Sequence, residues 1–297
     1  GAVVVGGNAS DVERRGAGLA GYRAVGDGDV PEGAVVGAGH PCEAVVGFID
    51  RTAVVGDVER AAAEVERRHF GAFGHGSEEP EVVALVGQRT DFPYEILIND
   101  DASTGGTADI IREYEQKYPE KIRALLQTEN QYSKGITNPS GAFNFPRVRG
   151  RYVAMCEGDD YWTDPEKLQK QVDYMEAHPD CSLCFHSARI ITVDGSLSDK
   201  RMRPYPESRI VSPSEIVDKP QGYAMASMMF RSEIIRKLPK YYVNCPVGDT
   251  PLQLMAAATG YGYYMDQDMS IYRLGAAVSW TSQGKLGDYE AKQERYC

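Results

Sequence analysis

The stretch "MCEGDDYW" holds the residue types in this sequence that are best placed to do chemistry. It gathers Glu157, Asp159 and Asp160 within four positions and runs on at once to Trp162. Carboxylates this close repel one another, so a cluster of them destabilises a loop unless something neutralises it. Mg²⁺ or Mn²⁺ takes one or two protein carboxylates and completes its shell with water and substrate phosphates. The stretch therefore predicts a divalent metal site that bridges to a diphosphate.

A second acidic pair, Asp100 and Asp101, lies in the stretch "INDDAS". Two acids at a turn are common, and often they only cap the following helix. A structural role therefore stays open for this pair. Trp162 also has two interpretations. An indole beside three acids suits a platform for a sugar or a base, whereas a large aromatic side chain is also ordinary packing material.

Alternating strand and helix patterns must position these acids. The sequence predicts strands over Tyr94–Asp100, Lys121–Thr128 and Gly150–Glu157, and a helix over Thr107–Tyr118. Such alternation is typical of an α/β fold, here a mixed, mostly parallel sheet with helices on both faces. Ligands bind such sheets just outside the carboxyl ends of the strands. Both acidic stretches follow a predicted strand, so we expect them to meet in one crevice.

Composition narrows the functional classes. The net charge of −11 over 297 residues argues against a nucleic-acid partner, which would require a basic surface. No apolar run approaches the roughly 20 residues of a membrane-spanning helix. The six cysteines are scattered without a disulfide rhythm, which favours a reducing compartment. The pair Cys181 and Cys184 lies in an apparent strand, where residues three apart face opposite ways, so we do not expect a metal site there.

The composition changes sharply near residue 88. Residues 1–87 are rich in Gly, Ala and Val, and they contain no Lys, Met or Trp, whereas residues 88–297 have an ordinary composition. The first segment shows no motif. A shifted reading frame and a divergent domain are both open interpretations of it. We therefore expect one catalytic domain over 88–297 and an atypical, poorly ordered segment over 1–87.

Three ordered motifs within residues 88–280 resemble the family 2 glycosyltransferases of the GT-A fold. They are "DFPYEILINDDASTGGTADIIREY", "RGRYVAMCEGDDYWTDPEKLQKQVDYMEAHPD" and "CPVGDTPLQLMAAATGYGYYMDQDMSIYRL". The resemblance implies a GT-A-like (Rossmann-like) fold. It also implies a role for each acid: Asp100 and Asp101 near the uracil and ribose of a UDP-sugar, Glu157, Asp159 and Asp160 at the metal-binding DxD motif, and Asp249 as the catalytic base.

This chemistry is within reach of the residues themselves. A bound dication stabilises the departing diphosphate as a Lewis acid, and a carboxylate can accept the proton of an acceptor hydroxyl. Attack from the face opposite the leaving group inverts the anomeric centre, as in inverting glycosidases. Asp249 has a structural alternative, because it could cap the helix that "TPLQLMAAA" predicts.

The sequence departs from the family pattern in three places. No aromatic-Asn turn closely precedes Asp100, no histidine follows Tyr272 and Arg273, and Pro146 interrupts a segment expected to be helical. We therefore expect 1–75 to pack loosely, with only the stretch before Arg89 docking as a helix. We also expect the strand Tyr94–Asp100 to have an unprotected edge.

The sequence thus predicts a metal-dependent, inverting glycosyltransferase that moves a sugar from a nucleotide-sugar donor, UDP-linked, to a glycan or lipid-linked acceptor in polysaccharide synthesis. The cofactor is Mn²⁺ or Mg²⁺, the location is cytoplasmic, and peripheral contact with the inner face of a membrane stays open. One alternative is a catalytically impaired nucleotide- or carbohydrate-binding module on the same fold. A nucleotidyltransferase is a third, although a Gly-rich basic loop near the start is missing.

Overall fold

The computed structural model describes residues 2–4, 43–49, 80–103, 106–192, 196–218, 222–245 and 248–274. Its strands are β1 (Ala2–Val4), β2 (Glu43–Ile49), β3 (Tyr94–Asp100), β4 (Ile122–Leu126), β5 (Tyr152–Met155), β6 (Tyr161–Trp162), β7 (Cys181–Thr192), β8 (Leu197–Met202), β9 (Arg209–Val211), β10 (Met229–Arg231) and β11 (Tyr261–Leu274). The α-helices are α2 (Pro80–Val86), α3 (Thr107–Lys117), α4 (Lys167–Ala177), α5 (Pro213–Asp218), α6 (Ser232–Arg236) and α7 (Asp249–Ala257). Shorter helical turns are η1 (Tyr132–Lys134), η2 (Ser140–Asn144), η3 (Phe145–Arg147), η4 (Met225–Ser227) and η5 (Lys240–Asn244).

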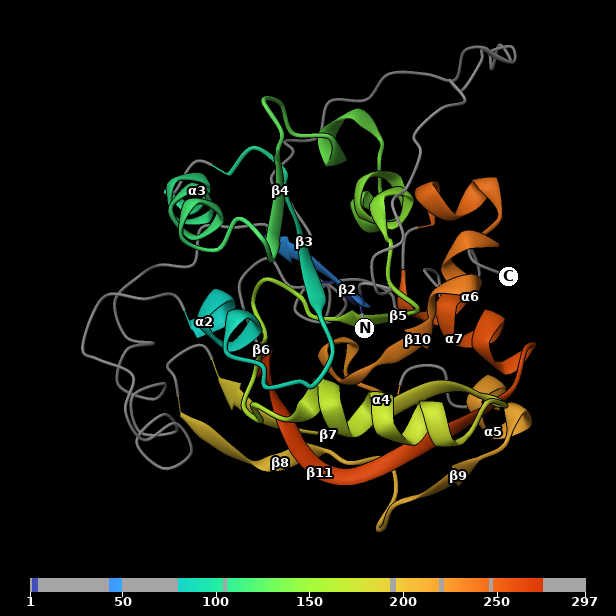
Figure 1. The fold of residues 1–297 in the computed structure, drawn as a ribbon. Coiled ribbons are helices and arrows are strands. Elements are labelled where there is room, and N and C mark those ends of the chain that lie inside the picture. The colour runs from blue at the N-terminus through green and yellow to red at the C-terminus, as the bar shows by residue number, and fades with distance from the viewer. Residues whose placement is uncertain are drawn as a thin grey trace.

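The strands form one mixed sheet (Figure 1). β4 lies beside β3, and the order continues through β2, β5, β10, β7 and β11 to β6. The pairs β3–β4, β2–β3 and β7–β11 are parallel, whereas β10 runs antiparallel to both β5 and β7. The predicted α/β class is therefore confirmed, and the strands predicted around residues 94–100, 122–126 and 152–155 all form.

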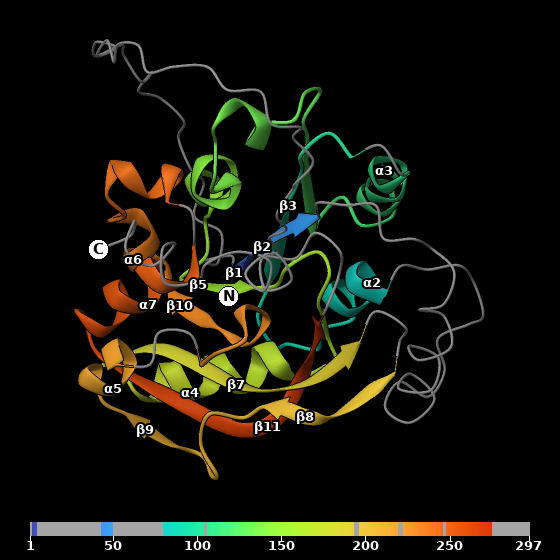
Figure 2. The same ribbon diagram turned by 180° about the vertical axis from the view of Figure 1, so that it is seen from behind.

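Strands from the N-terminal segment flank β3, so the expectation of an unprotected β3 edge is wrong. β2 pairs in parallel with β3 along its whole length, from Glu43 opposite Tyr94 to Ile49 opposite Asp100 (Figure 2). β1 aligns with part of the same stretch of β3, and both N-terminal strands also pair with β5. Short Val-rich pieces suit strands, even in a Gly-rich sequence. The loose packing expected for 1–75 falls mostly outside the described residues.

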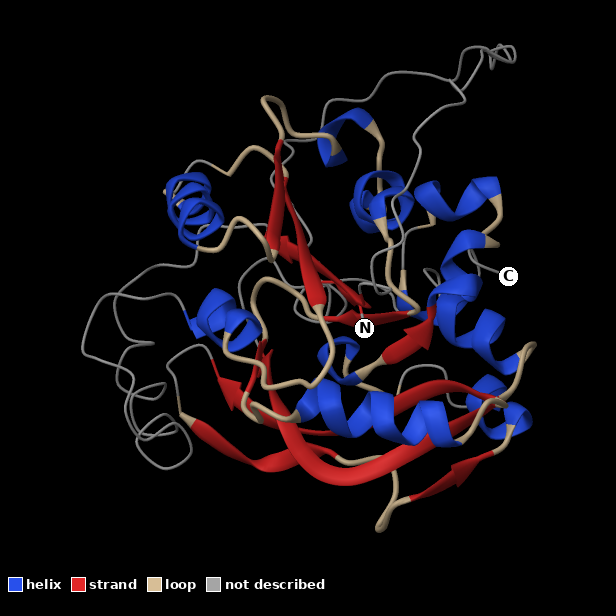
Figure 3. Cartoon of the chain, in the orientation of Figure 1, coloured by secondary structure: helices blue, strands red, loops and turns tan. Residues whose placement is uncertain are grey.

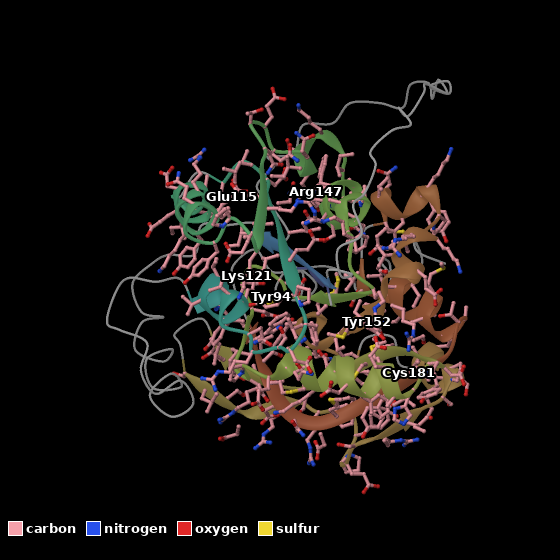
Figure 4. The ribbon with its side chains drawn as sticks, in the orientation of Figure 1. Tyr94, Glu115, Lys121, Arg147, Tyr152 and Cys181 are labelled. Carbon is pink, nitrogen blue, oxygen red and sulfur yellow. The ribbon has the colours of Figure 1, made fainter. Side chains whose placement is uncertain are left out.

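The helix predicted just before Arg89 is confirmed as α2. The Tyr94 hydroxyl at the start of β3 lies 3.1 Å from the Leu85 carbonyl and 2.9 Å from that of Val86. Lys121 Nζ donates to the same hydroxyl at 3.0 Å, and Figure 4 shows the two side chains together. These contacts satisfy carbonyls at the helix C-terminus. They fix α2 at the amino end of β3.

The helix that follows the "EGDDYW" loop packs over the second half of the sheet. Leu168, Val172 and Met175 recur at helical spacing on α4 and are all buried against β7. Gln171, on the same helix, is fully buried and donates to the carbonyls of Cys184 and Ser227 at 3.1 and 2.9 Å. α4 is therefore tied to β7 and to η4 by hydrogen bonds as well as by apolar contact.

The segment around Pro146 is among the helical parts drawn in blue in Figure 3, but it is not one continuous α-helix. η2 is a π-helical turn, and η3 is a 3₁₀ turn with Pro146 in its first positions, where no backbone N–H is needed. Arg147, labelled in Figure 4, donates to the Ile98 carbonyl at 3.2 Å and to Asn144 Oδ1 at 2.6 Å. The bond to Ile98 ties the segment to β3, and the bond to Asn144 joins η3 to η2.

Candidate active site

The two acidic stretches end strands that run the same way. β3 and β5 are both parallel to β2, which lies between them, so their carboxyl ends lie at one edge of the sheet. Asp100 is the last residue of β3, and the loop that holds Glu157, Asp159 and Asp160 begins directly after β5. This common edge is where ligands bind in open α/β sheets.

The acids of the second loop lie close enough to repel one another. Burial raises the pKa of Glu157 well above its usual value, and the carboxylates of Asp160, Asp159 and Asp249 raise it further. Burial also raises the pKa of Asp159, and its own backbone N–H and the positive charge of Arg273 partly offset that rise. Asp160 is 1% exposed, and its Oδ1 accepts the backbone N–H of Arg273 at 3.0 Å.

Asp249 joins this cluster from a distant part of the chain. It is the first residue of α7, and Gly248 occupies the N-cap position, so Asp249 is not the cap that the structural alternative required. Its Oδ1 accepts the backbone N–H of Thr250 at 2.8 Å. Burial raises the pKa of Asp249, and this hydrogen bond offsets part of the rise. A carboxylate with a raised pKa is a better proton acceptor near neutral pH than an ordinary one.

Close packing around Gly248 fixes the chain directly before Asp249. The Tyr242 hydroxyl donates to the Gly248 carbonyl at 2.8 Å, and Tyr242 is 2% exposed. A Cβ on Gly248 would lie 3.1 Å from Asn138 Nδ2, and one on Gly141 would lie 2.7 Å from the Tyr242 ring. Sequence reasoning missed these residues, because neither the isolated "NP" nor the pair "YY" forms a recognisable motif.

The donor set at this edge suits a divalent cation that the substrate helps to bind. The described part of the chain holds no group of three or more His, Cys, Asp or Glu side chains in position to coordinate one ion. Glu157, Asp159 and Asp160 therefore do not form a preassembled three-ligand cage. Magnesium and manganese sites in phosphate-transfer enzymes often use one or two carboxylates plus phosphate oxygens. The mutual repulsion around Glu157 is the charge imbalance that such an ion would relieve.

Asp100 and Asp101 are both buried, but their carboxylates differ. Asp101 accepts the backbone N–H groups of Gln131 and Tyr132, at 2.7 Å on Oδ1 and 3.0 Å on Oδ2. Asp100 accepts one backbone N–H, from Ser103 on Oδ2 at 3.3 Å, and the Ser103 side chain also acts on its carboxylate. Burial raises the pKa of Asp100, which the Ser103 hydrogen bonds partly offset.

Trp162 is not a binding platform in this structure. It is completely buried, and its Nε1 donates to the Ala226 carbonyl at 2.9 Å. Lys167 Nζ lies 4.1 Å from the centre of its ring. The strand β6 pairs with β11, which turns this indole into the core. The packing interpretation of Trp162 is therefore correct, and the platform interpretation is wrong.

Arg273 is a further residue of the site that the sequence did not single out. Its backbone binds Asp160, and its charge acts on Asp159, so it links the end of β11 to the acidic loop. The pair "YR" belongs to the last motif, but the family pattern there points to the missing histidine rather than to the arginine. A cation beside clustered acids is the signal that could have found it.

Comparison with known proteins agrees with this geometry. The model of the family described as "Glycosyl transferase family 2" matches residues 80–237, more than half of the chain. The chain belongs to glycosyl transferase family 2. This family 2 glycosyltransferase is 37% identical over 205 residues to the uncharacterized protein Rv1520 of Mycobacterium tuberculosis, an alignment that covers 67% of this chain and 55% of that protein. The chain thus spans little more than half the length of this relative.

Two other similarities concern sugar transfer and fold. The family 2 glycosyltransferase is 36% identical over 107 residues to TuaG of Bacillus subtilis, named as a putative teichuronic acid biosynthesis glycosyltransferase, with 36% of this chain and 40% of that protein covered. The crystal structure of S. aureus TarS 1–349 with UDP superposes with a TM-score of 0.50 at 15% identity, covering 79% of this chain and 61% of that one. The GT-A fold is therefore confirmed. Among the described helices, none is long and apolar enough to cross a bilayer.

Proposed function

We propose that this protein transfers a sugar from a UDP-sugar to an acceptor hydroxyl, with inversion at the anomeric carbon and with Mn²⁺ or Mg²⁺ as cofactor. The observation that carries the proposal is the approach of Asp249 to the acids of the 157–160 loop. A base and a metal-type carboxylate cluster at one edge are the two parts that this reaction needs. TuaG, a relative named for teichuronic acid biosynthesis, supports a polysaccharide as the acceptor class.

In this proposal each acid has one task. Asp249 accepts the proton of the acceptor hydroxyl, whose oxygen attacks the anomeric carbon. The bond from that carbon to the UDP oxygen breaks on the opposite face, and its electron pair leaves with the diphosphate. Glu157, Asp159 and Asp160 hold the divalent ion, which supplies Lewis-acid stabilisation of the diphosphate when bound. Asp101, with Asp100 beside it, lies at the nucleoside side of the donor.

TarS, whose fold this chain shares, has been crystallised with UDP, and this supports a uridine nucleotide as part of the donor. The predicted position at the inner face of a membrane, with a lipid-linked acceptor, stays a prediction.

Release of free UDP tests the proposal. Purified protein is incubated with UDP-glucose, UDP-N-acetylglucosamine and UDP-galactose, with Mn²⁺, and with oligosaccharide acceptors. UDP release that depends on Asp249 and stops on addition of EDTA supports transfer. UDP binding without release under any of these conditions would instead identify the impaired binding module. Release of pyrophosphate from a nucleoside triphosphate would identify a nucleotidyltransferase.

A further inference from the structure

Gln253, on α7, is a buried side chain whose amide makes no hydrogen bond within the described part of the chain. It is 0% exposed, and neither its Oε1 nor its Nε2 has a partner among the described residues. No other side chain in that part of the protein has two polar atoms in this state. A buried amide without partners costs stability, and such groups are rare in folded proteins.

A second fully buried glutamine shows how the same fold treats such a group elsewhere. Gln171, on α4, is also 0% exposed. Its Nε2 donates to the carbonyls of Cys184 and Ser227, and its Oε1 accepts a hydrogen bond from Lys167 Nζ. Three bonds thus replace the water that this amide lost on folding. Gln253 is buried as deeply without such bonds, so its amide does not serve the cohesion of the core.

Gln253 lies one helical turn after Asp249, on the same side of α7. Residues four apart in a helix are neighbours, and a helical side chain leans toward the helix N-terminus. The amide of Gln253 is therefore directed toward the turn that begins with Asp249. The other buried residues of this helix are apolar: Leu252, Ala256 and Ala257.

α7 is held on the sheet, and its first turn is the part that a ligand can reach. Ser182, on β7, donates from its Oγ to the Ala256 carbonyl at 2.8 Å, which fixes the last turn of the helix. Asp249, in the first turn, is only partly buried. A ligand that reaches the carboxylate of Asp249 therefore comes within one helical turn of Gln253.

We propose that Gln253 binds the acceptor sugar, a hexopyranoside, beside the hydroxyl whose proton Asp249 takes. An amide presents one hydrogen-bond donor and one hydrogen-bond acceptor side by side. Adjacent hydroxyls of a hexopyranose match that pair, because each hydroxyl can both donate and accept. The proposal rests on the proposed function and deepens it: the 157–160 loop holds the donor, and the inner face of α7 holds the acceptor sugar. A local cost in stability of this kind is expected where a residue serves function.

Apolar variants of the full chain test the role of the amide. Gln253→Met keeps the length of the side chain and removes both hydrogen-bonding atoms, and Gln253→Leu repeats the test with a branched side chain. Gln171→Met is the matched control, since it removes the same amide from an equally buried position on another helix. Each protein is melted without ligand, and UDP binding with Mn²⁺ is measured by calorimetry.

Kinetic measurements follow UDP release from UDP-glucose, UDP-N-acetylglucosamine and UDP-galactose. The first series has water as the only acceptor. The second adds methyl glucoside, methyl galactoside or methyl N-acetylglucosaminide at rising concentration, which gives the KM for the acceptor sugar.

We expect Gln253→Met to raise the melting temperature by about 2–4 °C, because an amide without partners is removed from the interior. The KM for the acceptor sugar should rise about tenfold or more, since hydrogen bonds to that sugar are lost. UDP affinity and the rate of release to water should stay within about twofold of the wild type. Gln171→Met should do the reverse, with a lower melting temperature and an unchanged KM for the acceptor sugar.

The proposal is overturned if Gln253→Met melts below the wild type, because the amide then has its partner within the protein. An unchanged KM for the acceptor sugar in both Gln253 variants overturns it as well, and so does a wild type whose UDP release none of the three glycosides speeds. Absence of both UDP binding and UDP release in the wild type would refute the proposed function instead. The melting temperatures would then still decide whether Gln253 is bonded inside the protein.

Discussion

The two edges of the sheet carry acids in opposite electrostatic settings. At the amino end, Glu95 is 1% exposed and its Oε2 lies 2.7 Å from Arg123 Nη1 and 2.6 Å from Arg149 Nη2. At the carboxyl edge of the same sheet, burial and three neighbouring carboxylates raise the pKa of Glu157. One buried acid is neutralised by two cations, and the other is surrounded by like charge.

This difference separates structural charge from functional charge. A carboxylate clasped by two guanidinium groups fixes the strands and loops that carry its partners, and it needs nothing else. A group of carboxylates that repel one another is an arrangement that folding alone would not favour, so it indicates a bound cation or a proton to be moved. In the proposed function, the same fold uses acids for stability at one edge of the sheet and for chemistry at the other.

The largest expected effect comes from neutralising Asp249, the proposed base at the carboxyl edge. Asp249→Asn keeps the shape of the side chain but cannot accept the acceptor's proton. Turnover should fall on the order of 10²–10⁴-fold, the usual share of general base catalysis. UDP binding should change little, and thermal stability should hold or rise because one like charge is gone. Steady-state UDP release and a melting curve measure both quantities.

The matched control for that variant is Glu233→Gln, which changes an exposed acid in the first turn of another helix, α6. Turnover should stay at the wild-type level. If Asp249→Asn lowers the melting temperature and leaves turnover intact, the carboxylate serves the helix and the contrast between the two edges fails.

Lys167 is a buried cation whose hydrogen-bond partner is a neutral amide, whereas Glu95 is paired with two cations. The pH dependence of unfolding should reveal this difference. Its ammonium donates to the neutral amide of Gln171 at 2.7 Å, and burial lowers its pKa to about 7. The native state therefore binds fewer protons than the unfolded state between about pH 7 and the ordinary lysine pKa near 10.5. In that window the free energy of unfolding rises as the pH rises, at up to about 1.4 kcal/mol for each pH unit.

Urea unfolding of the wild type and of Lys167→Met across this window measures the effect. The stability of the wild type relative to the variant should increase as the pH rises from about 7 to about 10. Lys170→Met is the control, since Lys170 lies on the same helix and pairs with the carboxylate of Asp164 at 2.6 Å. A constant difference between wild type and Lys167→Met would mean that the buried amine is neutral or fully charged throughout.

At the amino end of β3, Glu95→Gln should lower the free energy of unfolding without affecting the donor site. The amide cannot match the charged bonds to Arg123 and Arg149, so the free energy of unfolding should fall by about 1–3 kcal/mol. UDP affinity and turnover should stay at wild-type values. Chemical denaturation combined with UDP calorimetry checks this, and a loss of turnover in a protein of unchanged stability would contradict the structural role.

The smallest expected effect concerns the backbone at the end of β3. Ala102 follows the acid pair with a φ of 61°, in the left-handed region that favours glycine. Ala102→Gly should therefore raise the free energy of unfolding by about 0.5–1 kcal/mol, as relief of the strain outweighs the added chain entropy. A melting curve decides it: a lower melting temperature would mean that the methyl group packs productively.

Much of the fold could be predicted from local pattern. The apolar run of β3 and the helical spacing of Leu168, Val172 and Met175 are signals carried by neighbouring residues, and they formed as expected. The acids at strand ends were found in the same way, because the carboxyl ends of parallel strands share one edge.

Other features depend on contacts between distant residues, which no local pattern carries. Trp162 looked available beside three acids, yet the pairing of β6 with β11 buries it. Asp101 looked equivalent to Asp100 until the turn that binds it, thirty positions later, was in place. The N-terminal strands beside β3 were missed because a Gly-rich composition argued for weak order and hid two short Val-rich pieces.

Titration of UDP into the wild-type protein with Mn²⁺, and again with EDTA, tests most directly whether the acids at the carboxyl edge hold a metal against a donor diphosphate. We predict that EDTA weakens binding about tenfold or more, and that Asp159→Asn combined with Asp160→Asn binds UDP weakly in both conditions, because neutral amides replace anionic ligands. Equal UDP affinity of the wild-type protein with Mn²⁺ and with EDTA would contradict the metal-bridged site.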